Sequence, residues 1–267
     1  MQAPDYTQPL ALGSNALTWR TPPLSHILGC ALPSLGLGDR LVLRALALIA
    51  SRHVLAIHGL QHIRPATDPF ILAANHSTRR ESLLVPALLL LHRGGRLVHF
   101  LADWNFRLIP GVGFIYARAQ VVTVTRKSAK PRFLNILKPL YEQPLPTLER
   151  ARAHLAAGRA IGVFPEGEVN RDPTRLLRGR RGTARLSLEM GAPVVPMGIR
   201  FPGSDPTHPR AGRAAMEIHI GAPLVPSGPP QPQATMSSVS AWHATIMTEI
   251  ARLSGKAWTG AATGGQS

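Results

Sequence analysis

Cysteine and acidic residues are scarce in this 267-residue sequence. Cys30 is the only cysteine, which excludes an internal disulfide framework and a cysteine-based zinc cluster. Asp and Glu number 14 against 30 Lys and Arg, so the formal net charge is +16. Such a surface attracts polyanions. We therefore expect a phosphate-bearing partner, which could be nucleic acid, an anionic bilayer or a phosphorylated cofactor.

Aromatic residues are also few. The four tryptophans and three tyrosines form no stacking array interleaved with the basic residues, which argues against a nucleic-acid-binding protein. No secretory leader is recognisable at the start of the chain. Residues 21–38 carry no charged residue, but Pro22, Pro23 and Pro33 make this stretch a poor spanning helix.

The length allows one substantial core. From Val54 onward, short apolar runs alternate with helical patterns, which is typical of βα units on a mostly parallel sheet. The predicted strands are 54–59, 70–74, 97–101, 121–125, 160–164, 194–200 and 216–220, and the predicted helices are 82–91, 147–157, 180–190 and 236–253. We therefore predict one α/β domain with a mixed, mostly parallel sheet flanked by helices.

The flanking segments differ from this central pattern. Residues 1–53 are predicted to be an N-terminal membrane-associating region, 54–225 the main domain, and 226–267 a proline-rich connector, a C-terminal helix and a disordered tail. Residues 40–50 place Arg40 and Arg44 among leucines. That pattern fits a helix lying flat in lipid headgroups or a helix packed on the core, and the segment alone does not separate the two.

The first candidate site is the stretch NHSTRRE, in which Asn75 and His76 follow a predicted buried strand. Active sites of α/β sheets lie at such carboxyl ends. Five residues separate His76 from Glu81, so the two can meet only if His76 lies in the turn before the helix, with Ser77 or Thr78 as N-cap. A carboxylate on one imidazole nitrogen leaves the other free to accept a proton. A single pair of this kind can equally be structural.

The second candidate site is FPEG, where Glu166 and Gly167 follow another apolar strand. Glu166 could orient a substrate hydroxyl or a basic side chain, with the Gly167 backbone approaching the acceptor closely, or it could simply cap the turn. Six arginines follow within fifteen residues and could face a phosphate or form a solvated surface: Arg171, Arg175, Arg178, Arg180, Arg181 and Arg185.

A third candidate is Arg126, which ends the predicted strand 121–125 after a bend expected at Pro110, Gly111 and Gly113. The planar guanidinium suits phosphate oxygens, although a charged strand terminus is equally ordinary. The later stretch APVVPMGIR reads as a turn and a core strand.

The order of these blocks resembles the 1-acylglycerol-3-phosphate O-acyltransferase family of glycerolipid acyltransferases. NHSTRRE is similar to the family's Asn-His-x4-Asp block, the segment from Pro110 to Arg126 to its second block, FPEG to its Phe-Pro-Glu-Gly block and APVVPMGIR to its Val-Pro block. Two departures are visible. Glu81 stands where the family has Asp, and the third block lacks the usual Thr-Arg-Ser, leaving Arg171 as the candidate substitute.

The resemblance implies a membrane-surface enzyme that transfers a fatty acyl group to a lysophospholipid, foremost 1-acylglycerol-3-phosphate. By position, His76 is the base, Glu81 its partner, and Asn75, Arg126, Glu166, Gly167 and Arg171 bind substrate. The expected donor is acyl-CoA or acyl carrier protein, with no bound cofactor and no metal. The expected location is the cytoplasmic face of the cell membrane, in contact with anionic lipid. Another lyso-lipid acceptor, or a non-catalytic lipid-binding protein, remains an alternative.

Overall fold

The computed structural model describes residues 18–20, 22–108, 112–118, 120–124, 132–141, 145–205, 207–209 and 211–260. Its strands are β1 (Thr18–Arg20), β2 (Val54–His58), β3 (Ile71–Ala74), β4 (Val98–Asp103), β5 (Val122–Val124), β6 (Ala160–Val163), β7 (Val194–Arg200) and β8 (Met216–Ile220). The α-helices are α1 (Leu24–Gly29), α2 (Leu37–Ala50), α3 (Glu81–His92), α4 (Val112–Arg118), α5 (Thr147–Ala156), α6 (Gly182–Met190) and α7 (Met236–Ser254). Short 3-10 helices are η1 (Leu60–Ile63), η2 (Pro65–Thr67), η3 (Trp104–Leu108) and η4 (Arg132–Tyr141).

The strands form one eight-stranded sheet in the order β1-β2-β8-β7-β3-β6-β4-β5. The pairs β1/β2 and β7/β8 are antiparallel, and the other neighbouring strands run parallel. This arrangement confirms the predicted mixed, mostly parallel sheet. It brings the ends of β3 and β6 to the same edge, because these two strands are parallel neighbours.

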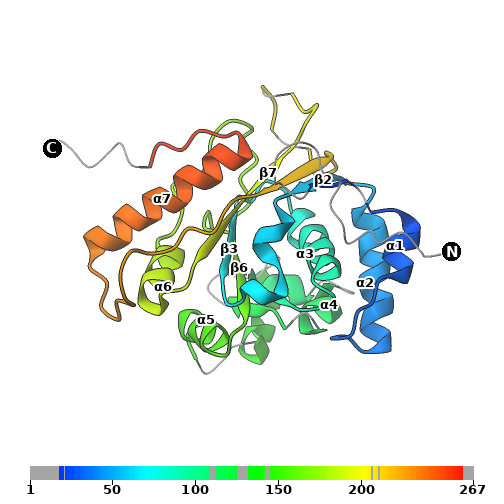
Figure 1. The fold of residues 1–267 in the computed structure, drawn as a ribbon, viewed down its shortest axis with the longest axis horizontal. Coiled ribbons are helices and arrows are strands. Elements are labelled where there is room, and N and C mark those ends of the chain that lie inside the picture. Colours follow the sequence, from blue (N-terminus) through cyan, green and yellow to red (C-terminus); the bar gives the residue numbers. More distant parts are fainter. Residues whose placement is uncertain are drawn as a thin grey trace.

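Helices cover both faces of the sheet, so the protein has three layers (Figure 1). One apolar core lies against α2 and α3, and the other against α5, α6 and α7. Strand β3 serves both, because Leu72 and Ala74 belong to the first core and Ile71 and Ala73 to the second. A strand buried on both faces needs a continuous apolar sequence, which β3 and β6 both have.

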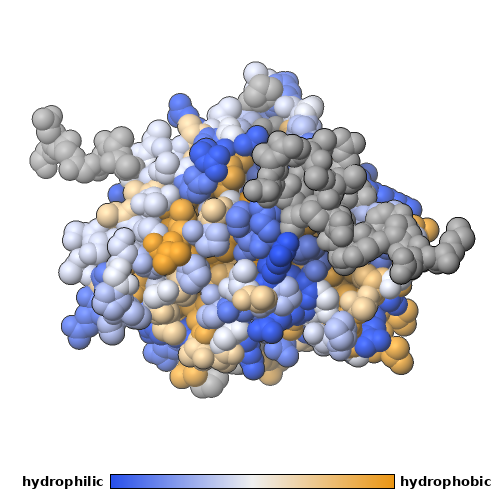
Figure 2. Space-filling view, in the orientation of Figure 1, coloured by the Kyte–Doolittle hydropathy of each residue, from blue (hydrophilic) through white to orange (hydrophobic). Residues whose placement is uncertain are grey.

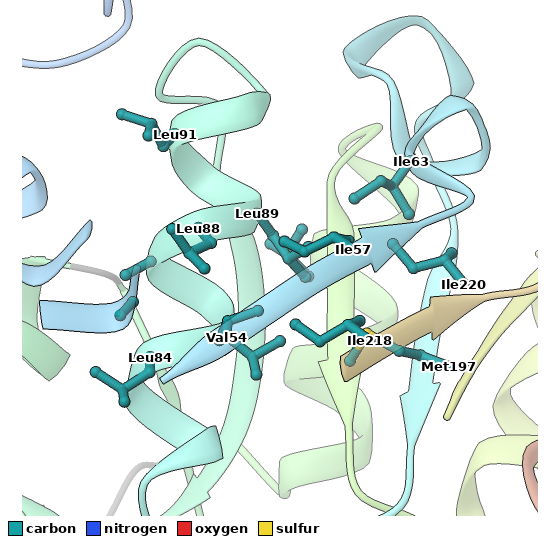
Figure 3. Packing of buried hydrophobic residues seen from close by; sticks show 14 of the residues in the cluster. Val54, Ile57, Ile63, Leu84, Leu88, Leu89, Leu91, Met197, Ile218 and Ile220 are labelled. Carbon is teal, nitrogen blue, oxygen red and sulfur yellow. The ribbon is translucent and has the colours of Figure 1, made fainter. Parts of the chain in front are cut away.

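Helix α3 packs part of its apolar surface against the sheet. In the close-up Leu89 lies beside Ile57 of β2, whereas Leu84 and Leu91 point away from the strands (Figure 3). All three leucines belong to the same apolar core as Val54, Ile57, Met197, Ile218 and Ile220. All of these side chains are buried. The contact fixes the first turn of α3, and therefore the site that precedes it, relative to the end of β3.

Helix α2 packs on the core with one part of its surface and leaves leucines exposed on another. Leu43, Ala47 and Ala50 are buried in the core beside α3, whereas Leu37 and Leu41 are 78% and 66% exposed. In the part of the chain that the structure describes, no helix is long and apolar enough to span a membrane.

Every predicted strand and helix of the central region is present, with ends shifted by a few residues. The bend expected at Pro110, Gly111 and Gly113 falls partly on residues 109–111, which lie outside the described residues, and Gly113 itself lies in α4, which occupies 112–118. A glycine fits there since a Cβ at Gly113 would lie 2.4 Å from the carbonyl oxygen of Arg107. Strand β1 and helix α1 were not predicted. The boundaries at 53 and 225 stay predictions, and the predicted tail at 261–267 lies outside the described residues.

Candidate active site

His76 lies in the turn between β3 and α3, as the spacing to Glu81 required. Its Nδ1 is 2.7 Å from Oε1 of Glu81. The His76 residue is 7% exposed and Glu81 is fully buried. The carboxylate therefore holds the imidazole with Nδ1–H toward Oε1, which leaves Nε2 as the nitrogen that can accept a proton.

Glu81 is the first residue of α3, and its carboxylate closes the turn before it. The backbone N–H of Ser77 also donates to Oε1, and the Thr78 hydroxyl lies 3.4 Å from Oε2. The N-cap residue is Arg80, which makes no side-chain cap hydrogen bond, so the predicted capping by Ser77 or Thr78 is wrong. Instead, the Glu81 carboxylate accepts the Ser77 backbone N–H. Glu is one methylene longer than Asp, and this length lets the carboxylate extend back to the turn.

Burial raises the pKa of Glu81, whereas the hydrogen bonds from His76, Thr78 and Ser77 act to lower it. Desolvation is the larger effect, since the carboxyl group is removed from water. Such a carboxylate stabilises an imidazolium strongly once Nε2 has taken a proton.

Phe164 forms the floor under the imidazole. Its ring stacks on that of His76 with centroids 4.4 Å apart. Phe100 packs against Phe164 in turn and crosses Gly162 of β6, where a Cβ would lie 2.6 Å from the Phe100 ring. The glycine is therefore needed for the aromatic pair that fixes the plane of His76.

Glu166 supports the loop that carries His76. Its Oε1 accepts the backbone N–H of His76 at 2.9 Å, and its Oε2 accepts from Asn170 and from the backbone N–H of Leu177 at 2.7 and 2.9 Å. Asn170 closes the ring by donating its own N–H to the His76 carbonyl. Both carboxylate oxygens of this buried residue are thus engaged by the protein. This geometry favours a positioning role for Glu166 over the predicted contact with the acceptor.

Asn75 has a similar role between strands. Its side chain accepts the backbone N–H of Ile199 at 2.6 Å and donates to the Ile199 carbonyl at 3.1 Å. Asn75 is fully buried, and neither it nor Glu166 is among the described residues that line the adjoining cavity. The predicted substrate contact of Asn75 is replaced by a link from the end of β3 to β7.

A cavity of about 1610 Å³ opens beside His76. Apolar side chains of α2, α3 and β4 contribute to its lining, among them Val42, Leu46, Leu83 and Phe100. Six arginines also line it and outnumber the three lining acids, Asp39, Asp103 and Glu168: Arg79, Arg118, Arg132, Arg150, Arg171 and Arg180. A cavity lined by both apolar and cationic side chains suits a molecule with a hydrocarbon chain and an anionic group.

A family model described as Acyltransferase matches residues 54–200, which include the His76–Glu81 pair and the Glu166 loop. The chain belongs to the Acyltransferase family. No curated protein matches the sequence closely enough to add to this.

The fold of this acyltransferase is similar to that of a solved enzyme. The 1-acyl-sn-glycerophosphate (LPA) acyltransferase PlsC from Thermotoga maritima aligns with a TM-score of 0.54 at 18% sequence identity. The alignment covers 86% of this chain and 88% of PlsC. At this identity the likeness concerns the α/β architecture.

Gly167 and Arg180 meet at the cavity of the acyltransferase. Gly167 has a φ of +73°, and a Cβ there would lie 2.5 Å from Nε of Arg180. Glycine is thus required both for the backbone conformation and for the close approach of the guanidinium. Arg180 is further anchored by its N–H, which donates to the Pro165 carbonyl at 2.7 Å.

The predicted arginine cluster divides in the structure. Arg171 and Arg180 line the cavity, and the other four are absent from its described lining. Arg126 lies outside the described residues, so its role stays a prediction. Arg79 and Arg150 also line the cavity and were missed, because isolated arginines carry no sequence signal of a site.

Lys256 is a buried residue of the acyltransferase that the sequence did not point to. It follows α7, and its ammonium group donates to the Ser77 hydroxyl at 2.9 Å and to the Asp172 carbonyl at 2.7 Å. The contact joins the loop after β3, the loop after β6 and the end of the chain's last helix. Because 179 residues separate Lys256 from Ser77, no local pattern could have revealed it.

Proposed function

We propose that this acyltransferase moves a fatty acyl group from a thioester donor to the free hydroxyl of a lysophospholipid, foremost 1-acylglycerol-3-phosphate. The observation that carries the proposal is the 2.7 Å contact between His76 Nδ1 and Glu81 Oε1, beside a cavity lined by both apolar side chains and arginines. The architecture shared with PlsC, whose name states that same reaction, supports it.

In the proposed mechanism Nε2 of His76 removes the proton from the acceptor hydroxyl as the oxygen attacks the thioester carbonyl. Glu81 stabilises the imidazolium that forms. The tetrahedral intermediate collapses by breaking the carbon–sulfur bond, and the thiolate leaves and takes up a proton. No covalent acyl-enzyme is needed, because the acceptor itself is the nucleophile.

The acceptor phosphate is proposed to bind at arginines that line the cavity. Arg180, fixed across Gly167, and Arg171 are the candidates among the described residues, with Arg126 as the third predicted ligand. Guanidinium groups bind phosphate oxygens in a bidentate manner. The third sequence block lacks the family's arginine, and Arg180 reaches the same loop from thirteen residues further along the chain than Gly167.

The acyl chain is proposed to lie along the apolar side chains of the cavity, from α2, α3 and β4. The donor is acyl-CoA or acyl carrier protein. Both offer phosphate to a chain with net charge +16, and a carrier protein with an acidic surface offers further charge. No bound cofactor enters the mechanism.

We also propose that the enzyme works on the surface of an anionic membrane, at the cytoplasmic face. Elements that contribute residues to the cavity lining also carry exposed apolar side chains: Leu37 and Leu41 on α2, Phe114 on α4, and Phe133, Ile136 and Leu140 on η4. In the space-filling view, apolar side chains gather at the lower right, where Figure 1 places α1 and α2 (Figure 2). Apolar side chains beside arginines are typical of surfaces that enter lipid headgroups.

The test is product analysis by mass spectrometry. Purified protein is given a mixture of lysophosphatidate, other lysophospholipids and a lyso-aminolipid, with acyl-CoA or acylated carrier protein as donor. Phosphatidate as the main product supports the proposal. A different acylated lipid as the main product would show that its lyso form, and not lysophosphatidate, is the acceptor. A protein that consumes neither donor yet binds vesicles equally well after His76→Ala would be a lipid-binding protein without catalysis.

A further inference from the structure

Three potential metal ligands gather on the sheet away from the cavity. His58 ends β2, and Glu217 and His219 lie on the neighbouring strand β8. The two strands are parallel, with His58 and His219 as direct partners in the register. Glu217 is two residues before His219, so its side chain points to the same face.

The side chains converge on one point of that face. The imidazole rings of His58 and His219 stack with centroids 4.5 Å apart, and one ligand atom from each of the three residues lies within 4.8 Å of the other two. A tetrahedral zinc ion with bonds of about 2.0–2.2 Å holds its ligand atoms about 3.4 Å apart. Small side-chain rotations, without movement of the strands, would bring the three atoms to that spacing.

The Nε2 atom of His219 is buried and lacks a hydrogen-bond partner among the described residues. Glu217 Oε2 is the nearest carboxylate oxygen at 3.6 Å, which is too long for a hydrogen bond. A buried unpaired nitrogen costs free energy, which a ligand would recover.

The arginine opposite Glu217 in the strand register is engaged elsewhere. Arg200 is the register partner of Glu217 on β7, but its guanidinium donates to the carbonyls of Leu253 and Arg252 at 2.6 and 3.2 Å. These hydrogen bonds direct the guanidinium to backbone carbonyls at the end of α7.

We infer that His58, Glu217 and His219 form a binding site for one divalent transition-metal ion of the zinc class. Two imidazoles and one carboxylate are a donor set that such ions bind with a fourth position left to water. The ion would join β2 to β8, at the place where the parallel edge of the sheet meets the antiparallel pair β7/β8. None of the three residues is in the described lining of the cavity, so the site is separate from the His76 chemistry.

The experiment is a titration of the full-length, chelator-treated protein with Co²⁺, followed by its visible absorption, and then displacement by Zn²⁺. We expect saturation at one equivalent with the intense bands of tetrahedral Co²⁺, and a higher Tm with Zn²⁺ but not with Mg²⁺. His58→Gln, Glu217→Gln and His219→Gln are measured separately, after circular dichroism has shown that each is folded. Each should weaken binding by more than about tenfold, since loss of even an indirect support of a ligand costs about 10–100-fold.

Two control variants locate the ion. His208→Gln removes an exposed histidine that also pairs with a carboxylate, Asp205, and His76→Ala removes the histidine of the candidate active site. Both should bind Co²⁺ as the parent protein does. Absence of saturable binding, or binding that all three cluster variants retain, would overturn the inference. Binding lost in either control would place the ion elsewhere and would overturn it as well.

Discussion

At the scale of single residues, the account depends on how Glu81 holds His76. The carboxylate is fully buried, and Oε1 accepts from both the imidazole and the Ser77 N–H. Glutamine keeps the size of the side chain but cannot stabilise an imidazolium by charge. We expect Glu81→Gln to lower kcat by about 10²–10⁴-fold with little change in KM.

The measurement for Glu81→Gln is steady-state transfer of labelled acyl groups. Glu189→Gln is the matched control, because Glu189 forms its ion pair with Arg152 outside the cavity lining. That control should keep its kcat. A Glu81→Gln enzyme with parental kcat would show that the carboxylate has no part in proton transfer.

Arg180 makes a second prediction at this scale. Its guanidinium packs across Gly167 at the cavity, and loss of a charge-assisted hydrogen bond costs about 1.5–3 kcal/mol. Arg180→Gln should therefore raise KM for a phosphate-bearing acceptor about tenfold or more, and leave KM for the acyl donor nearly unchanged. Arg185→Gln is the control, because Arg185 is a partly buried arginine absent from the described lining. Equal KM values for both variants would remove Arg180 from the acceptor site.

The sequence predicted these residues unevenly. His76 and Glu81 are five apart, and a turn between a strand and a helix is the geometry in which they can meet, so local reasoning placed the pair correctly. Asn75 and Glu166 lie in the right loops, but Asn75 pairs with Ile199 on β7 and Glu166 with the backbone of His76, and only the folded chain brings these partners near. Lys256 depends entirely on the tertiary fold.

At the scale of elements, buried histidines couple the packing of helices to pH. Burial lowers the pKa of His154 on α5, and of His92 at the end of α3, to about 4 in each case. In the unfolded chain both histidines have a pKa of about 6.5. Between pH 6.5 and 4 the unfolded state therefore binds more protons, so stability is complete above about pH 6.5 and falls as the pH drops toward 4.

Urea unfolding at several pH values measures this effect. The parent protein should lose stability steadily from pH 6.5 downward, and His154→Gln and His92→Gln should each show a shallower loss relative to their own values at pH 8. His154 lies against His99 of β4, with ring centroids 4.2 Å apart, so protonation there separates α5 from the sheet. Parallel pH profiles for parent and variants would refute the assignment.

Helices and strands were predictable where the apolar periodicity is long or where a strand is buried on both faces of the sheet. The apolar strands β3, β6 and β7 and the periodic helices α3 and α7 were all expected from sequence. Strand β1 has three residues and forms only by pairing with β2. Helix α4 was not expected from sequence, because Gly113 within it and the preceding Pro110 and Gly111 favour a bend over a helix.

At the scale of the whole molecule, charge and exposed leucines together predict how the protein meets a membrane. Binding to anionic vesicles should weaken as salt rises, because the +16 chain is screened. The double change Leu37→Glu and Leu41→Glu should weaken it further by at least about tenfold at any salt concentration, through lost apolar contact. Vesicle sedimentation measures both.

Val225→Glu is the control for the vesicle experiment. Val225 is 66% exposed and precedes α7, on the side of the sheet opposite α2 (Figure 1). It should bind vesicles like the parent. Unchanged binding of the α2 double variant would move the membrane-contacting surface away from this helix.

The overall architecture followed from sequence, because alternating apolar runs and helical patterns admit few arrangements besides a layered α/β sheet. The His58–Glu217–His219 cluster could not be predicted from sequence, since its members come from strands about 160 residues apart and meet only through the β2/β8 register. Sites built across a sheet from distant strands need the topology before they can be recognised.

The central claim is that His76 is the base for acyl transfer, and the most direct measurement compares His76→Ala with His208→Ala. His208 also contacts a carboxylate at 2.7 Å, but it is exposed and outside the described lining of the cavity. With both variants shown to be folded, the account predicts that His76→Ala loses acyl transfer by about 10²–10⁴-fold or more, whereas His208→Ala keeps the parental rate. A folded His76→Ala enzyme that acylates the lysophospholipid at the parental rate would contradict the account.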